Sequence, residues 1–221
     1  MKKILCACGM AVVLAGCGSG GTTMSSATPS TPASTASLSG AVADGYLVNA
    51  TVFLDKNRNY QLDAGEPSTE SGANGAYTLQ VAPEDIGKYP IVAVATQGVT
   101  IDTDTGTPVT GSYVLSIHPQ AVSGAVSNFI SPMSSQIREL MEGGATMQQA
   151  MEQLCTRLGL PGDTNMMQDY IASGNTVMHS AARTMATQMG SQMQQVMAGS
   201  GASTTVDVMR YRAMMGSMMR Q

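Results

Sequence analysis

The sequence contains no Trp and only two Phe, and charged residues make up just 12% of its 221 positions. With so few aromatic rings, a folded core must rely on aliphatic side chains and on Met, which occurs 19 times. The net charge is −4 at pH 7, whereas a nucleic-acid-binding surface needs a basic patch. The composition therefore excludes nucleic acid as an expected partner.

The N-terminus has the layout of a secretory signal. Two lysines precede an apolar run that ends at Leu14 and is too short to span a bilayer. The tetrapeptide Leu14-Ala15-Gly16-Cys17 resembles the lipobox of bacterial lipoproteins. This resemblance implies that residues 1–16 are a signal peptide and that Cys17 carries a diacylglycerol thioether and an acylated amino group. Several acyl chains together anchor a protein stably in a membrane.

Residues 17–37 are predicted to form the lipidated end and a flexible tether. After Cys17 they consist of Gly, Ser, Thr, Ala, Pro and one Met without charge, a composition that cannot bury enough apolar surface to fold. Twenty such residues have a typical end-to-end distance of roughly 25 Å. In similar lipoproteins of diderm bacteria, a residue other than Asp after the lipidated Cys, here Gly18, implies transport to the outer membrane. We therefore expect a lipid-anchored protein of the bacterial cell envelope, located at the outer membrane.

The mature chain has too few cysteines for an intramolecular disulfide. Cys6 and Cys8 leave with the signal peptide, Cys17 is consumed by lipid, and Cys155 remains alone. Cys155 lies on an apolar helical stripe, which favours a buried, inert thiol over a reactive one. No apolar stretch after Cys17 approaches the length of a membrane span, so lipid is the only anchor that the sequence indicates.

Residues 38–118 have the pattern of a small β-rich domain that carries most of the negative charge. The range holds nine acidic residues and three basic ones, and its short apolar runs are separated by turn signals such as Asp44-Gly45 and Asn74-Gly75. This spacing, without a helical period, predicts a small antiparallel β-sandwich. Strands are expected at Leu38–Ala43, Tyr46–Leu54, Ala76–Val81, Pro90–Thr96 and Ser112–Ile117.

Residues 119–221 follow a helical period and are predicted to form a Met-rich helical module. Ser131 and Pro132 are typical of a helix start, and Thr146 can cap a second helix that ends at Gly159. Residues 175–198 and the segment from Thr205 onward predict two further helices. The expected fold class is therefore α+β, with a small antiparallel β-sandwich followed by an α-helical module.

The loop between the second and third predicted strands carries the clearest candidate site. Its side-chain oxygens fall at positions 1, 3, 5 and 9 of an EF-hand-like loop, and the Glu at position 12 can bind calcium through both oxygens. Calcium takes six to eight oxygen ligands, so this spacing suits a structural calcium ion. The candidate ligands are Asp55, Asn57, Asn59, Gln61 through its backbone carbonyl, Asp63 and Glu66.

Two features distinguish this loop from a true EF-hand. Position 6 is Tyr60, where the EF-hand has Gly for a sharp turn, and the flanking segments are predicted strands, not helices. Tyr60 would need an unfavourable backbone geometry to follow the EF-hand path. These departures indicate a related loop on another scaffold, with a calcium dissociation constant of roughly 0.1 to 1 mM. The alternative is a solvated acidic turn that holds no metal.

Residues 38 to about 82 resemble a known bacterial module. They are similar to the prealbumin-like sandwich of surface-protein B domains and carboxypeptidase-regulatory-like domains, in which an Asp-x-Asn-x-Asn loop ending in Gly-Glu binds calcium. The segment Ile130–Ser135, followed by Leu158–Pro161, resembles a part that often follows such modules in exported multidomain proteins. The resemblance to the sandwich is carried by Val42–Tyr46, Ala50–Asp55, Asp63–Pro67 and Ala73–Leu79.

The methionines of the last third recur at helical spacing. A four-residue interval keeps side chains on one helix face, and Met fills gaps in a core without aromatic rings, so we favour a core or partner-contact role. Soft thioethers at this spacing could instead hold Cu(I) in an oxidising compartment, or act as sacrificial targets of oxidation. The stripe consists of Met185, Met189, Met193 and Met197. The same four-residue interval recurs near the C-terminus between Met214 and Met218 and between Met215 and Met219.

Together, these features predict a non-enzymatic, lipid-anchored envelope protein that serves binding, adhesion or assembly. The sequence offers no convincing catalytic constellation, since its two histidines, His118 and His179, lie in different predicted modules. The expected partners are the membrane, through the lipid on Cys17, and a protein or cell-surface molecule. The alternative from another class is a periplasmic Cu(I)-handling protein that uses the methionine stripe.

Overall fold

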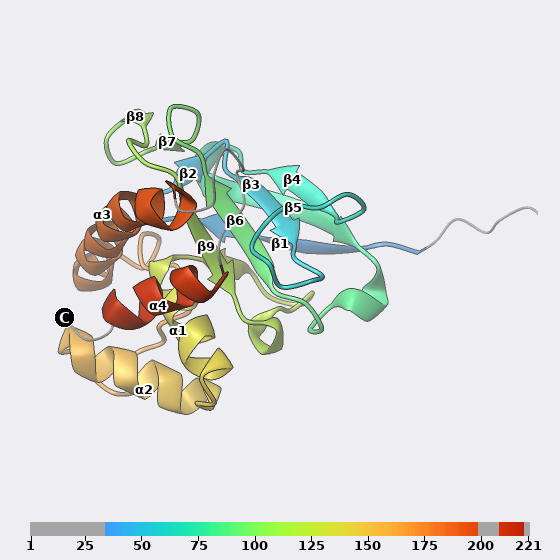
Figure 1. Cartoon of the computed structure of the whole chain (residues 1–221). Helices are drawn as coiled ribbons and strands as arrows, with labels where there is room; N and C mark the ends of the chain where they lie inside the picture. The colour runs from blue at the N-terminus through green and yellow to red at the C-terminus, as the bar shows by residue number, and fades with distance from the viewer. Residues whose placement is uncertain (1–33, 199–207, 219–221) are drawn as a thin grey trace, which may run out of the picture. The chain divides into compact units, whose positions relative to one another are not determined.

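The structure is a computed structural model that describes residues 34–198 and 208–218. In these ranges ten strands form three sheets and four α-helices follow them in the chain, which confirms the predicted α+β class (Figure 1). The strands are β1 (Ala36–Val42), β2 (Leu47–Val48), β3 (Thr51–Leu54), β4 (Ser68–Glu70), β5 (Ala76–Val81), β6 (Ile91–Ala95), β7 (Ile101–Asp102), β8 (Thr107–Pro108), β9 (Tyr113–Ile117) and β10 (Asn128–Ile130). The helices are α1 (Pro132–Glu142), α2 (Met147–Leu158), α3 (Thr176–Ala198) and α4 (Val208–Met218).

The largest sheet has the strand order β4-β3-β6-β9 and is antiparallel throughout. A second sheet has the order β10-β1-β5, and a third, of two-residue strands, has the order β2-β7-β8. Four of the five predicted strands correspond closely to β1, β5, β6 and β9.

The fifth predicted strand, Tyr46–Leu54, is divided into β2 and β3. Asn49 between them has a φ of 61°, in the left-handed region that Asn tolerates better than most residues. The Asn49 N–H donates to the carbonyl of Ser71 over 2.8 Å, so the break is held by a partner next to β4. Because the apolar pattern continues across the break, the sequence alone indicated one strand.

The sheet around β1 is mixed, which differs from the antiparallel arrangement expected. β1 pairs antiparallel with β5 and parallel with β10, which lies within the range predicted as helical. The buried Asn128 side chain holds this pair, since its Nδ2 donates to the carbonyl of Ser39 over 3.1 Å and to that of Ser123 over 2.8 Å. A three-residue strand is too short to show a period of two, so the sequence did not indicate it.

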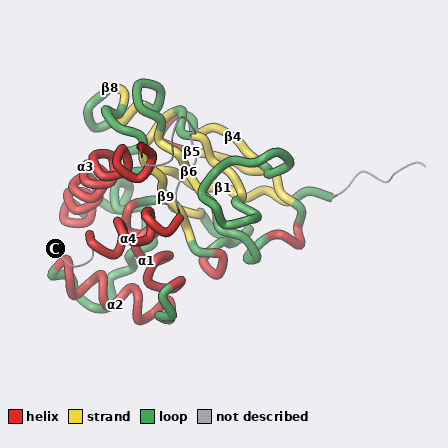
Figure 2. Tube along the Cα trace, viewed as in Figure 1, coloured by secondary structure: helices red, strands yellow, loops and turns green. Residues whose placement is uncertain are grey.

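The strands of the core differ in how many of their faces are covered. In β5 buried and exposed residues alternate, whereas β6 and β9 are buried along almost their whole length. Both α1 and α3 pack against β9, and Figures 1 and 2 show the helices gathered on one side of the sheets. Strands β3, β6 and β9 of the large sheet are therefore interior and mostly apolar, whereas β4 at its edge is largely exposed.

The first two helices begin and end as the sequence predicted. Ser131 and Thr146 are their N-caps, each in a reciprocal pair of hydrogen bonds with the residue three positions later. Pro132 occupies the first turn of α1, and Gly159 ends α2 in the left-handed conformation, with φ 64°. Helices α3 and α4 correspond to the other two predicted segments, although Thr205 itself lies outside the described residues.

The described methionines of the stripe lie in the core. Met185, Met189 and Met193 are between 0 and 8% exposed, and the Cys155 side chain is also fully buried. Burial raises the pKa of the Cys155 thiol, as expected for an inert one. The side chains of Met197 and Met219 lie outside those that the structure describes. The other buried thioethers of the C-terminal helices are Met178, Met214, Met215 and Met218.

Residues Ala33–Gln221 belong to one compact unit. The signal peptide, Cys17 and the tether up to residue 33 lie outside the described residues, and the last two tether residues, Ala36 and Ser37, are part of β1. Where the structure describes helices, none has both the length and the apolar character to cross a membrane. The division into residues 38–118 and 119–221 as separate modules stays a prediction.

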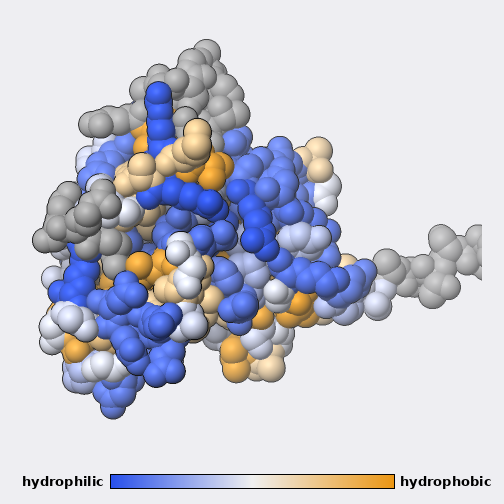
Figure 3. Space-filling model, turned by 60° about the horizontal axis from the view of Figure 1, so that its bottom comes forward, coloured by the Kyte–Doolittle hydropathy of each residue, from blue (hydrophilic) through white to orange (hydrophobic). Residues whose placement is uncertain are grey.

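The displayed surface is mostly hydrophilic. Figure 3 shows hydrophobic side chains in small patches separated by polar ones. The large hydrophobic residues that the structure describes as exposed are likewise spread over several elements, which is ordinary for a folded chain. They are Leu62, Val99, Val126, Val177 and Met209.

Candidate functional site

The predicted calcium loop, Asp55–Glu66, connects β3 to β4. Asp55 follows directly after the last residue of β3, and Glu66 lies two positions before β4. Both flanks are therefore strands, as the sequence indicated. The local fold brings the first and last predicted ligands to the same edge of the large sheet.

Backbone N–H groups fix the ligand oxygens of the first half of the loop. The two carboxylate oxygens of Asp55 accept from the N–H groups of Asn59, over 3.0 Å, and Tyr60, over 3.1 Å. The Oδ1 of Asn57 accepts from the Asn59 N–H over 3.2 Å, and the Oδ1 of Asn59 from the Gln61 N–H over 2.8 Å. The Asn57 and Asn59 contacts are Asx turns, and together with the two longer contacts of Asp55 they hold the three side chains in fixed conformations.

The second half of the loop closes on the first through two carboxylates. Asp63 Oδ2 accepts from the side-chain amides of both Asn57 and Asn59 over 2.7 Å. Glu66 accepts from the N–H of Lys56 over 2.7 Å and from the N–H of Asp63 over 3.0 Å. The structure thus brings the predicted ligand side chains together, apart from Gln61, whose predicted contribution is its backbone carbonyl.

The donor set is of mixed chemistry. Within residues 34–198 and 208–218, no three Asp, Glu, His or Cys side chains form a group able to hold a metal ion. In this loop two of the predicted ligands are amides, and the amide groups of Asn57 and Asn59 currently fill the space beside Asp63 with nitrogen. A half-turn of each amide would present oxygen there instead, because the two ends of the group are nearly isosteric, and would give up the hydrogen bonds that the two Oδ1 atoms accept from the N–H groups of Asn59 and Gln61. The residues therefore fit a hard, oxygen-loving cation.

Tyr60 adopts the strained backbone that its position in the loop demands. Its φ is 63°, and Arg58 two residues earlier has φ 62°, both in the left-handed region. This conformation costs a non-Gly residue roughly 1 to 2 kcal/mol. The Tyr60 side chain is only 1% exposed, and burial of a large side chain stabilises by about 1.5 to 3 kcal/mol. The buried ring therefore offsets the strain of the turn.

The Tyr60 ring is held by the helices. The guanidinium of Arg138, from α1, lies 4.1 Å from the ring centroid, and the Tyr211 ring, from α4, lies 4.5 Å away. The Tyr60 hydroxyl donates to the carboxylate of Glu139. Burial raises the pKa of both Tyr60 and Glu139 above their ordinary values.

Arg138 is the most deeply buried charge beside the loop. It is 0% exposed, and its nitrogens lie 3.8 Å from Asp55 Oδ2 and 3.8 Å from Glu142 Oε1, beyond hydrogen-bond distance. Burial raises the pKa of Asp55, although Arg138 and the loop N–H groups act in the opposite direction. We name this set of contacts the loop–helix cluster; it comprises Asp55, Tyr60, Arg138, Glu139, Glu142, Tyr211 and Arg212.

The sequence did not indicate the loop–helix cluster. In the sequence, Tyr60 differed from the Gly expected at position 6 of an EF-hand loop, and the helix that contains Arg138 was predicted from its apolar residues alone, such as Ile137. Each of the two residues therefore departs from the pattern of its own segment. A charged residue inside an apolar face and a ring in place of Gly are the signals that could have found it.

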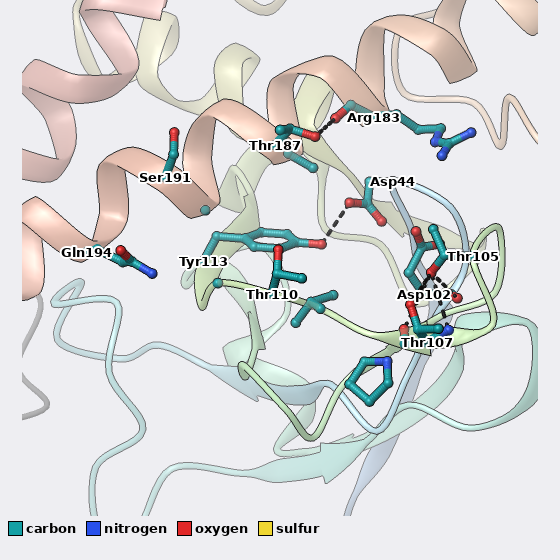
Figure 4. Close-up of a pocket in the computed structure, with 15 residues that line it drawn as sticks. Asp44, Asp102, Thr105, Thr107, Thr110, Tyr113, Arg183, Thr187, Ser191 and Gln194 are labelled. Atoms are coloured by element: carbon teal, nitrogen blue, oxygen red, sulfur yellow. Dashed lines mark hydrogen bonds between the residues drawn. The ribbon is translucent and has the colours of Figure 1, made fainter.

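A separate polar pocket of about 410 Å³ lies between α3 and the chain from β7 to β9 (Figure 4). Figure 4 shows polar side chains of α3 on one wall and those of the β7–β9 segment on the other. At its base a Cβ placed on Gly111 would lie 2.9 Å from the carbonyl oxygen of Gly190, so the two backbones approach closely. The labelled polar lining comprises Asp44, Asp102, Thr105, Thr107, Thr110, Tyr113, Arg183, Thr187, Ser191 and Gln194.

Asp44 is the buried carboxyl of this pocket. It is 7% exposed, its Oδ2 accepts from the Tyr113 hydroxyl over 2.7 Å, and its Oδ1 has no hydrogen-bond partner. Burial, followed by the charges of Asp102 and Asp104, raises the pKa of Asp44 from 3.8 to about 7, against the lowering effect of Tyr113. The sequence did not indicate this pocket, because its walls are far apart in the chain.

Comparison with protein families, with characterised proteins and with solved structures gave no match. The resemblances seen in the sequence therefore rest on its motifs. Cys17, the predicted lipidation site, lies outside the described residues.

Proposed function

We propose that this protein is a non-enzymatic lipoprotein of the bacterial envelope, whose β-rich part is a prealbumin-like sandwich stabilised by calcium. The lipid on Cys17 would tether it to the outer membrane, and the folded unit would serve binding, adhesion or assembly. The observation that carries the calcium site is the hydrogen-bonded form of the loop Asp55–Glu66. Its predicted ligand side chains are already gathered by hydrogen bonds from backbone N–H groups and by hydrogen bonds to one another.

Calcium would add positive charge to a loop that holds three predicted carboxylate ligands. Asp55 lies beside Arg138, whereas Lys56 of the loop is paired with Asp85 over 2.7 Å, outside the loop. At ten times its dissociation constant, calcium would stabilise the fold by about 1.4 kcal/mol through mass action. The ion is therefore a structural element of the proposed site. Its protein ligands would be Asp55, Asn57, Asn59, the carbonyl of Gln61, Asp63 and Glu66.

Thermal unfolding of the chain from Ala33 to Gln221 tests the calcium site. Calcium at ten times its dissociation constant should raise the melting temperature by about 3 to 6 °C, whereas magnesium should have less effect. Glu66→Gln should abolish the calcium shift, because it removes one oxygen charge from position 12. Glu70→Gln, on the exposed part of β4, is the matched control and should keep the shift. An equal shift in both variants would reject the site.

The lipid anchor is tested on the full chain in a bacterial host. Cys17→Ser should abolish incorporation of a labelled fatty acid and release the protein from the membrane fraction. Cys8→Ser, within the predicted signal peptide, is the control and should remain lipidated. Protease added to intact cells would then show whether the folded unit faces outward. If both variants remained lipidated, Cys17 would not be the lipidation site.

The copper alternative gains no support from the described side chains. The sulfurs of Met185, Met189 and Met193 are enclosed in the core, where they pack against apolar neighbours. Their burial favours the core role that the sequence also favoured. A Cu(I)-handling function stays an untested alternative.

A further inference from the structure

Two residues of the proposed ion loop also contact side chains of the helices. Asp55 is the first loop ligand, and its Oδ2 lies 3.8 Å from Arg138 Nη2 on α1. Tyr60 shapes the middle of the loop by its backbone, while its ring is enclosed by Arg138 and by Tyr211 on α4. The loop and α4 therefore share a contact, although about 150 residues separate them in the chain.

Helix α4 has additional links to the same cluster. Arg212 lies 3.8 Å from Glu139 Oε2 and 3.3 Å from Glu142 Oε2, and the buried Tyr211 hydroxyl donates to the carbonyl of Val114 over 3.1 Å. Tyr211 is 0% exposed. The position of α4 thus defines one wall of the space that the Tyr60 ring occupies.

We propose that cation binding in the loop and packing of α4 stabilise each other, with Tyr60 as the residue that couples them. This inference rests on the proposed calcium site. The coupled elements are the loop Asp55–Glu66 and the helix Val208–Met218, and the coupling is a property of side-chain packing, not of direct contact between ion and helix.

The physical basis is the strained turn at Tyr60. The loop can present its oxygens inward only while Tyr60 stays at φ 63°, and the enclosed ring is what offsets the strain. If α4 packs loosely, the ring loses Tyr211 and the turn is less populated, so a cation binds more weakly. By thermodynamic reciprocity, a cation that fixes the turn also favours the packed position of α4. We expect a coupling of about fivefold in affinity, at the lower end of the usual range.

Hydrogen exchange, measured on the chain Ala33–Gln221 with calcium and with a chelator, tests the coupling. Calcium should slow exchange in α4 about fivefold, while α2, which packs on α1, serves as the internal reference and should respond less. Tyr60→Gly introduces the residue that EF-hand loops use at position 6. This variant should bind calcium at least as well as the natural chain, yet exchange in α4 should no longer respond to calcium.

A second variant tests the reverse direction and guards against misfolding of the first. Tyr211→Leu removes the α4 ring that contacts Tyr60 and should weaken calcium binding about fivefold by calorimetry. Ala213→Ser, at an exposed position of the same helix, is the matched control and should bind calcium normally. If Tyr60→Gly does not fold, Tyr211→Leu alone decides.

The outcomes separate the two proposals. Absence of calcium binding in the natural chain would overturn the calcium site, and the coupling with it. Calcium binding with unchanged exchange in α4, or with equal affinity in Tyr211→Leu and Ala213→Ser, would overturn only the coupling and leave the site in place.

Discussion

Asp44 and Asp55, two of the buried aspartates among the described residues, come shortly after β-strands but lie in very different surroundings. Asp55 accepts two backbone hydrogen bonds and lies beside a buried guanidinium. Asp44 has one hydroxyl partner, an unpartnered oxygen, and two further aspartates, Asp102 and Asp104, in its vicinity. Both carboxyls have a raised pKa because burial penalises their charge, but Asp55 has two backbone N–H donors and a guanidinium beside it, whereas Asp44 has a single hydroxyl donor.

This difference shows that burial alone does not decide whether a carboxyl group is charged in the folded protein. Asp55 is organised to be ionised, since its oxygens face N–H groups and Arg138, and it sits where a cation is proposed. Asp44 is organised to be neutral, because its surroundings supply more negative than positive charge. Breaking either arrangement should therefore have opposite consequences for stability.

Arg138→Met should have the largest effect on the side of Asp55. Removal of the guanidinium leaves Asp55 and Glu142 without their buried counter-charge, which should destabilise the fold by about 3 to 5 kcal/mol at pH 7. The loss should shrink at acid pH, where Asp55, whose pKa is raised by burial, takes up a proton. Urea unfolding at both pH values measures it. Arg183→Met, a half-exposed pair with Asp104, is the control and should change stability by less than about 1 kcal/mol.

Asp44→Asn should stabilise the fold at alkaline pH. The folded pKa of about 7 exceeds the ordinary value of 3.8, so the folded state keeps a proton that the unfolded chain has released. The natural protein therefore loses stability from this group as the pH rises from about 4 to about 7. The difference amounts to as much as about 4 kcal/mol. Asn has no such proton, so the variant should be more stable at pH 8 and nearly equal to the natural chain at pH 4.

Urea unfolding as a function of pH measures this difference. The groups that face Asp44 are Tyr113, Asp102, Asp104 and the buried Tyr170, whose hydroxyl lies 3.2 Å from the Asp44 carbonyl oxygen. Asp163→Asn, at an exposed position, is the control for loss of a carboxyl in general. A variant that is less stable than the natural chain at pH 8 would contradict the neutral state of Asp44.

Gly111→Ala should disturb the packing of α3 beside the pocket that Asp44 lines. The added methyl group would meet the carbonyl oxygen of Gly190 at 2.9 Å, so α3 must shift away from the β8–β9 connection. We expect a loss of about 1 to 3 kcal/mol, typical of overpacking. Because water then reaches Asp44 more easily, its pH-dependent difference should also become smaller. Gly162→Ala, where a Cβ meets nothing within 4 Å, is the control.

Tyr60→Phe should have the smallest effect on stability, and it should alter the surroundings of Asp55 but not those of Asp44. The ring stays enclosed, while the hydroxyl loses its hydrogen bond to Glu139 and its contact with Arg212. The free energy of unfolding should fall by about 1 kcal/mol, as for one buried hydrogen bond. Tyr89→Phe, at a less buried tyrosine, is the control. A loss as large as that of Arg138→Met would mean that the hydroxyl, and not the ring, holds the turn.

Local chemistry explains which parts of the fold could be predicted from the sequence. The caps Ser131 and Thr146, the stop at Gly159 and the alternation in β5 depend on neighbours within a few residues, and all were predicted. The oxygen pattern of Asp55–Glu66 was equally local. The β10 strand and the loop–helix cluster depend on partners about 70 to 150 residues away, and no short pattern specifies such distances.

The same reasoning applies to Tyr60. The sequence indicated only that Tyr60 would need an unfavourable backbone if the loop followed the EF-hand path, and Tyr60 does adopt a left-handed backbone, with φ 63°. The sequence did not predict that burial of the Tyr60 ring offsets this strain, because the ring is enclosed by residues of α1 and α4, which are distant in the chain. The burial of Asp44 was not predicted for a similar reason. The pair Asp44-Gly45 is typical of an exposed turn, and the sequence does not show that α3 lies over it.

The parallel pairing of β1 with β10 has a mechanical consequence. β1 is the first described element after the predicted tether, and it lies in the middle of its sheet, between β5 and β10. A pull on the chain before Ala36 is therefore resisted by two rows of hydrogen bonds at once, one of which is closed by residues 128–130. Force applied at the proposed lipid anchor would therefore load a central strand of the fold, which separates less easily than an edge strand that has only one neighbour.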